Sequence, residues 1–157
     1  MGNYHNIEPE FIQRTLLLIE QYYGVLDKYP FKEQFNYTLT INCLLGLIVM
    51  PKERVISYVP TDRLTRELLE EIGAPSLEVN ERIRTLRDLI KSLRNAVAHF
   101  DINVISESDQ NLVDWLEFSD SENGEGLVAK FHATELVPFL RYYADCLLKN
   151  MANYREQ

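Results

Sequence analysis

A chain of 157 residues is long enough for one domain with a sizeable core and too short for two comfortable ones. Its composition, 46% hydrophobic and 25% charged, excludes a disordered or low-complexity protein. The net charge of −8 argues against binding nucleic acid through a broadly basic surface, so any contact with RNA has to be local.

The first half of the chain predicts two long helices. Apolar residues at steps of three and four after Pro9 indicate a first helix that runs to about Asp27. A second helix is expected from Phe31 or Gln34 to Met50, where Pro51 ends it. Its apolar stretch is well short of the roughly 20 residues that a membrane span needs, so we expect no transmembrane helix.

Two further helices are predicted in the middle of the chain. A short one begins at Thr61-Asp62 and ends at Gly73, which Pro75 follows. The next is expected to start near Ser76 to Glu78 and to run to about Phe100 or Ile102.

In the last third of the chain the spacing of the apolar residues changes from a helical period to a period of two, and then returns to a helical period. Alternating residues between about 103 and 133 predict a small β-hairpin or meander, with one strand from Leu112 to Phe118. Thr134 is then expected to cap a final helix. The predicted fold is mainly α: one domain over residues 1–157, a four-to-five-helix bundle with a β-hairpin insertion before the last helix.

The N-terminus has no basic region followed by an apolar stretch, which favours a cytoplasmic protein. Cys43 and Cys146 both lie among apolar residues, so we interpret them as core thiols. The three histidines, His5, His99 and His132, are scattered, and no metal-site spacing is present. We therefore expect neither a metal nor another cofactor.

The most informative segment is Arg94 to His99. The helix that carries it has one apolar stripe, at about 100° per residue, made of Ile83, Leu86, Ile90, Leu93, Val97 and Phe100. Asn95 and His99 point away from this stripe, one turn apart, and Arg94 sits on the flank. A basic edge accompanies them: Arg84, Arg87, Lys91 and Arg94. Together a guanidinium, an amide and an imidazole can hold a phosphate and move a proton.

The spacing Arg94-Asn95-x3-His99, late in a helical chain of this size, resembles the HEPN superfamily, in its stand-alone bacterial and plasmid-borne branch. Many members have glycine after the histidine, where this chain has Phe100. The resemblance implies a metal-independent ribonuclease that leaves 2′,3′-cyclic phosphate and 5′-hydroxyl ends. It also implies catalysis by Arg94, Asn95 and His99 in a homodimer with a composite site, and a toxin or antiphage role with a possible antitoxin partner.

Simpler interpretations stand beside these. An exposed helical histidine is usually a surface residue, so the chain could be an inactive module that binds nucleotide or a protein partner, or a structural dimerisation bundle. Asp101 could orient the imidazole or cap the following turn. The tyrosines at 22, 23, 142 and 143 could stack on bases, although packing is commoner. The carboxylates of Glu67 to Glu71 are expected to form a solvated face.

Overall fold

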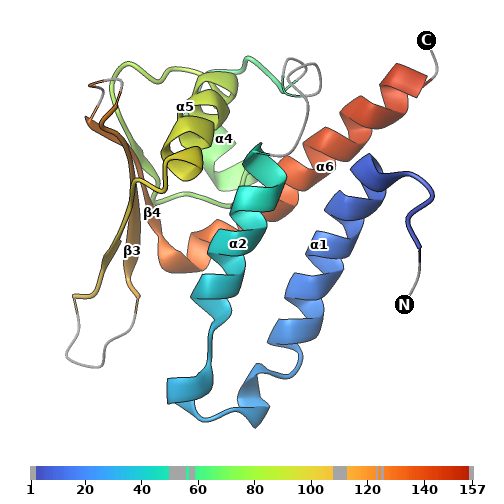
Figure 1. The fold of residues 1–157 in the computed structure, drawn as a ribbon. Coiled ribbons are helices and arrows are strands. Elements are labelled where there is room, and N and C mark those ends of the chain that lie inside the picture. The colour runs from blue at the N-terminus through green and yellow to red at the C-terminus, as the bar shows by residue number, and fades with distance from the viewer. Residues whose placement is uncertain are drawn as a thin grey trace.

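The structure is a computed structural model that describes residues 3–49, 56, 59–107, 113–122, 124 and 126–155. Its helices lie on one side of a small antiparallel sheet (Figure 1). The helices are α1 (Ile7–Tyr23), α2 (Asn36–Val49), α4 (Arg66–Glu71), α5 (Leu86–Ala98) and α6 (Leu136–Arg155). The strands are β1 (Glu78–Val79), β2 (Ile102–Ile105), β3 (Trp115–Asp120) and β4 (Gly126–His132). The fold is mainly α, as predicted.

The first two helices agree with the apolar spacing. In α1, Ile12, Thr15 and Ile19 are buried at the three- and four-residue steps expected of one helix face. Single 3₁₀ turns at Leu26–Lys28 and Phe31–Glu33 follow, and α2 then ends at Val49. Met50 and Pro51, where we expected this helix to end, lie outside the described residues.

The two middle helices begin later than predicted, and their capping bonds explain why. The Thr65 hydroxyl accepts a hydrogen bond from Leu68 N at 3.3 Å, so α4 starts after Thr65 and not at Thr61. In the same way the Thr85 hydroxyl accepts from Asp88 N at 3.2 Å and starts α5. The Thr85 hydroxyl also donates to the Asp88 carboxylate at 2.7 Å.

The residues between 76 and 85, predicted as the first turns of the motif helix, form strand β1 and a turn instead. Glu78 pairs with Lys130 and Val79 with Ala129, which adds β1 to the edge of the sheet. The Asn80 side chain then accepts from Arg82 N at 3.0 Å and turns the chain. A strand partner 50 residues away therefore overrides the local helical spacing.

The predicted hairpin or meander is present as three strands. β2 pairs with β3 and β3 with β4, all antiparallel, and the sheet order is β1-β4-β3-β2. Leu112, the expected first residue of the central strand, lies outside the described residues. A 3₁₀ turn at Ala133–Glu135 leads into α6. Thr134, expected to cap α6, lies inside that turn, and its hydroxyl is 2.8 Å from His132 Nδ1.

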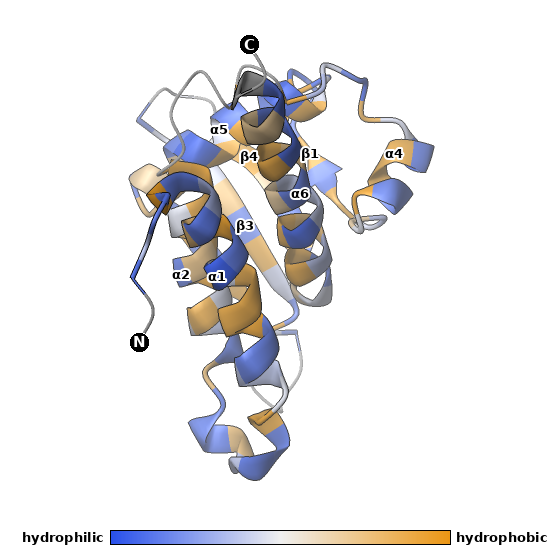
Figure 2. Ribbon diagram, turned by 90° about the vertical axis from the view of Figure 1, so that its right-hand side faces the viewer, coloured by the Kyte–Doolittle hydropathy of each residue, from blue (hydrophilic) through white to orange (hydrophobic). Residues whose placement is uncertain are grey.

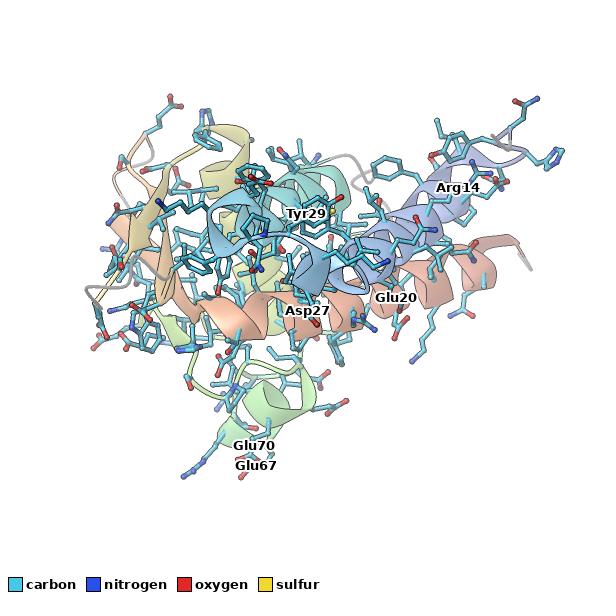
Figure 3. The ribbon with its side chains drawn as sticks, turned by 90° about the horizontal axis from the view of Figure 1, so that it is seen from below. Arg14, Glu20, Asp27, Tyr29, Glu67 and Glu70 are labelled. Atoms are coloured by element: carbon cyan, nitrogen blue, oxygen red, sulfur yellow. The ribbon has the colours of Figure 1, made fainter. Side chains whose placement is uncertain are left out.

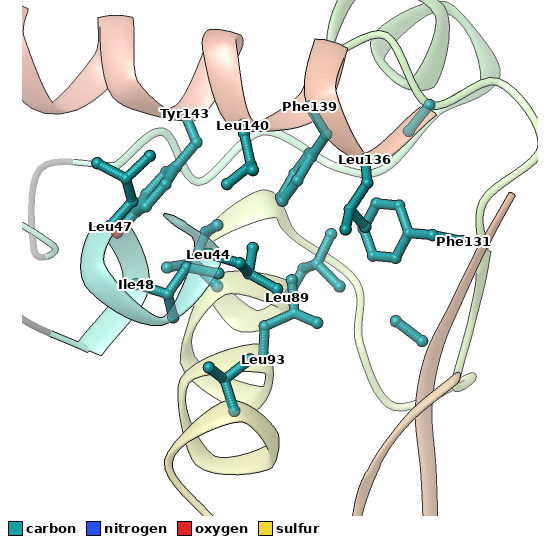
Figure 4. Close-up of a cluster of buried hydrophobic side chains, with 14 of the residues drawn as sticks. Leu44, Leu47, Ile48, Leu89, Leu93, Phe131, Leu136, Phe139, Leu140 and Tyr143 are labelled. Carbon is teal, nitrogen blue, oxygen red and sulfur yellow. The ribbon is translucent and has the colours of Figure 1, made fainter. Parts of the chain in front are cut away.

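The core lies between α2, α5, α6 and the sheet. Figure 4 shows side chains from all four meeting there; the labelled ones are Leu44, Leu47, Ile48, Leu89, Leu93, Phe131, Leu136, Phe139, Leu140 and Tyr143. In Figure 2 apolar and polar segments alternate along α1, α2 and α6, as expected of helices with one buried side. Cys43 belongs to this core, whereas Cys146 is only partly buried, so the prediction of two core thiols was wrong for the second.

The surface agrees with the expected solvated face of α4. Glu67 and Glu70 project from the outer side of this helix, away from the rest of the molecule (Figure 3). Among the described residues, no helix is long and apolar enough to cross a membrane. Within the same residues, no three histidine, cysteine or acidic side chains gather as metal ligands would.

Candidate active site

The buried side of α5 fixes the direction of the motif. Leu86, Ile90, Leu93 and Val97 are all buried, as the stripe predicted, and Leu89 and Ala96 complete the same side. Ile83 is also buried but precedes the helix. Asn95 and His99 are both exposed, so the predicted phase of the motif is confirmed.

Phe100 is the exception, because it is 66% exposed and not part of the stripe. The helix ends at Ala98, His99 is its C-cap, and Phe100 has the left-handed φ of 54°. Phe100 N donates to Val97 O and Asp101 N donates to Ala96 O, at 3.2 and 2.8 Å. This pair of bonds is a Schellman motif, whose left-handed residue is usually glycine. The departure at Phe100 therefore falls on a position where a side chain is strained.

Asn95 joins α5 to the end of strand β3. Its amide nitrogen donates to the Asp120 carboxylate at 3.2 Å, and Asp120 is only 3% exposed. A buried carboxylate needs hydrogen-bond donors to compensate for its lost hydration. Asn95 thus holds the β3–β4 turn against the helix next to His99.

His99 has a carboxylate partner that the sequence did not reveal. Its Nδ1 lies 3.1 Å from Glu122 Oε2, and the two side chains are 46% and 68% exposed. The imidazole also stands at the C-terminal end of α5, where His99 is the C-cap residue. An imidazole in this position can exchange a proton with solvent or with a bound molecule.

Asp101 stabilises the turn that carries Glu122. Its carboxylate accepts a hydrogen bond from Ser121 N at 2.9 Å, and its backbone oxygen accepts from Ser119 N at 2.9 Å. The hydrogen bonds from Ser121 hold the pKa of the Asp101 carboxyl below its usual value. Of the two interpretations of Asp101, the structure favours the structural one, because Glu122 takes the place beside the imidazole.

Arg94 occupies the flank of α5 on the side of α6. Arg94 is partly buried. Burial raises the pKa of the Tyr143 hydroxyl, and the positive charge of Arg94 opposes part of that rise. Along the predicted basic edge, Arg87 donates from Nε to Val59 O at 3.0 Å, Lys91 is exposed, and Arg84 is exposed but precedes the helix. The structure thus brings Asn95 and His99 to one acidic turn and places Arg94 near a different helix.

The residues that sequence reasoning missed all belong to this turn. Asp120 and Glu122 lie in a segment rich in serine, acidic residues and glycine, and this composition predicts a loop and nothing more specific. The sheet register brings them to α5, and neither local spacing nor composition reveals such a long-range contact. The tyrosines considered for stacking on bases differ in exposure: Tyr143 is buried in the core, whereas Tyr23 is exposed.

Comparison with known proteins agrees with the resemblance drawn from the motif. The model of the family described as HEPN pEK499 p136 matches residues 1–154. The chain belongs to this HEPN family. Membership suggests a nuclease-like or nucleotide-binding function. Searches of the curated proteins and of the solved structures found no match.

Proposed function

We propose that this chain is a metal-independent endoribonuclease. The observation that carries the proposal is the exposed imidazole of His99, which has a carboxylate partner and ends the motif helix in a chain of the HEPN family. The reaction is attack by a ribose 2′-hydroxyl on the adjacent phosphorus. The bond from phosphorus to the 5′-oxygen breaks, which leaves a 2′,3′-cyclic phosphate and a 5′-hydroxyl.

Each motif residue has a proposed part in this reaction. His99 transfers a proton as general base or acid, a contribution of about 10²–10⁴-fold in proteins generally. Arg94 binds the phosphate and stabilises the charge that develops on its oxygens. Asn95 positions His99 by holding the neighbouring turn through Asp120.

A homodimer would complete the site. The reaction needs both a base and an acid, and one protomer offers one imidazole at this surface. A symmetric dimer would supply two copies of His99 and Arg94 to one cleft. Phe100, exposed beside His99, is an apolar side chain that such an interface would bury. A toxin or antiphage role in the cytoplasm, with an antitoxin as partner, belongs to the same proposal.

The test is cleavage of a mixed RNA in chelator by the purified protein and by its His99→Ala variant, with mapping of the cut ends. His132→Ala is the matched control, because His132 lies on β4 and contacts Trp115 and Thr134, away from the motif. The parent and the control should leave cyclic phosphate ends, and His99→Ala should not. Equal cleavage by the parent and His99→Ala would point to a contaminating nuclease and contradict the proposal.

A second candidate, a catalytically inactive dimeric module that binds nucleotide or a protein partner, is favoured by two observations. Asp101, Asp120 and Glu122 lie beside Asn95 and His99, and their negative charges would repel a phosphate. A hollow of about 490 Å³ beside the same turn is lined by Glu78, Glu81 and Arg82, and by none of the three motif residues. This candidate predicts binding without any motif-dependent turnover of RNA.

A further inference from the structure

The pair formed by His99 and Glu122 determines which nitrogen of the imidazole carries a proton. An ionised carboxylate only accepts hydrogen bonds, so the nitrogen facing it has to be the donor. Glu122 Oε2 lies 3.1 Å from Nδ1. The proton of the neutral ring is therefore on Nδ1, and Nε2 carries the free lone pair.

We propose that Glu122 is a positioning residue that fixes His99 in the Nδ1–H form, so that Nε2 is the atom that meets the RNA. This inference rests on the proposed ribonuclease function. Nε2 takes the proton of the 2′-hydroxyl as the 2′-oxygen bonds to phosphorus. The bond from phosphorus to the 5′-oxygen then breaks, and the leaving oxygen takes a proton from the imidazolium of a second subunit. The negative charge of Glu122 stabilises the imidazolium that forms on the first ring.

Glu122 can do this because its turn is attached to α5 at several points. Asp101 holds Ser121 through its carboxylate and Ser119 through its backbone oxygen. Asn95 holds Asp120, the last residue of β3. The residues immediately before Glu122 are thus held both by α5, through Asn95, and by Asp101, which follows the helix. An exposed side chain needs such a fixed backbone to stay beside its partner.

Three acidic residues of the described part of the chain lie at the end of α5 that carries His99. Glu122 faces the ring from the β3–β4 turn, Asp120 ends β3, and Asp101 lies two residues further along the chain. The C-terminal end of α5 adds its partial negative charge. Because the pair is exposed, its effect should weaken as salt is added.

The first test is nitrogen NMR of the His99 ring, recorded where the imidazole is neutral, on the parent, Glu122→Ala and Glu122→Gln. We expect the proton on Nδ1 in the parent and a loss of that preference in Glu122→Ala. Glu122→Gln should keep the Nδ1–H form, because its amide oxygen still accepts a hydrogen bond. Glu81→Ala, which removes an exposed carboxylate from a neighbouring turn, should leave the ring unchanged. A parent ring with its proton on Nε2, or no change in Glu122→Ala, would overturn the inference.

The second test is the cleavage rate. Glu122→Ala should lower kcat by about 10- to 100-fold with little change in KM, a part of the general acid–base contribution. Equal kcat in the parent and Glu122→Ala would contradict the positioning role. The two proposals fail in different ways: if His99→Ala cuts RNA as the parent does, the ribonuclease is refuted, whereas the NMR result still decides what Glu122 does to the ring.

Discussion

The two sides of α5 are fixed by different parts of the molecule. The buried side packs against α2 and the sheet through leucine, isoleucine and valine, so it depends on shape and apolar area. The exposed side is tied to the β3–β4 turn by a few polar contacts, at Asn95 and His99. Substitutions on the buried side should therefore destabilise the fold most. On the exposed side, Asn95 should contribute to stability through Asp120, whereas His99 should mainly affect activity.

Leu93→Ala should have the largest effect on stability. Leu93 is 0% exposed in the centre of the core, and deletion of such a side chain costs about 2–5 kcal/mol because a cavity remains. Denaturant unfolding measures the loss. Lys91→Ala, two residues earlier and exposed, is the control and should change the free energy of unfolding by less than about 0.5 kcal/mol. Equal effects of the two variants would contradict the assigned phase of α5.

Asn95→Ala should have an intermediate effect. It removes a hydrogen bond from the buried Asp120 carboxylate, a loss of about 1–3 kcal/mol in the free energy of unfolding. Ser92→Ala, one turn earlier on the same side of the helix, is the matched control for a polar truncation and should stay near the parent. If Asn95→Ala is as stable as Ser92→Ala, then Asp120 does not depend on the amide.

Phe100→Gly should raise stability by about 1 kcal/mol. The substitution relieves a side chain at φ 54° and removes an exposed aromatic ring that packs little. Thermal unfolding is the measurement, with Phe35→Gly as control, since Phe35 is similarly exposed but has no positive φ. If the protein is a dimer, the same variant should also weaken association, which analytical ultracentrifugation would detect.

Asp101→Asn should have the smallest effect on the free energy of unfolding, and this effect should appear only at acidic pH. The folded pKa of Asp101 is lowered, so its stabilising contribution is complete above the unfolded pKa, near 4. That contribution is lost as the pH falls through the lowered folded pKa. The parent should therefore lose stability below about pH 4 more steeply than Asp101→Asn, as measured by unfolding at a series of pH values. If stability falls equally with pH in the parent and in Asp101→Asn, the Asp101 carboxylate does not stabilise the fold in the way proposed.

The parts predicted from sequence are those that local periodicity determines. The phase of α5 was recognisable because its apolar residues face one core, and the motif residues lie within a few positions of one another. The predicted start of α5 was wrong because β1 forms through pairing with β4, about 50 residues away, which local spacing does not reveal. The prediction that Phe100 belongs to the buried stripe was wrong because Phe100 continues the apolar spacing of α5 after the helix has ended.

The site was only half visible in the sequence. Arg94, Asn95 and His99 could be named, but their partners Asp120 and Glu122 depend on where the β3–β4 turn lies in space. Asn95 and Asp120 are 25 residues apart, and the sheet register decides their contact. The sequence therefore indicated the groups that could do chemistry and not the groups that hold them.

The most direct test of the account measures RNA cleavage and the free energy of unfolding side by side for the parent and His99→Ala. We expect His99→Ala to keep the parent's stability to within about 0.5 kcal/mol and to lose the formation of cyclic phosphate ends. A variant that still cuts RNA as the parent does, or that loses its fold together with its activity, would contradict the claim that the exposed side of α5 performs the chemistry.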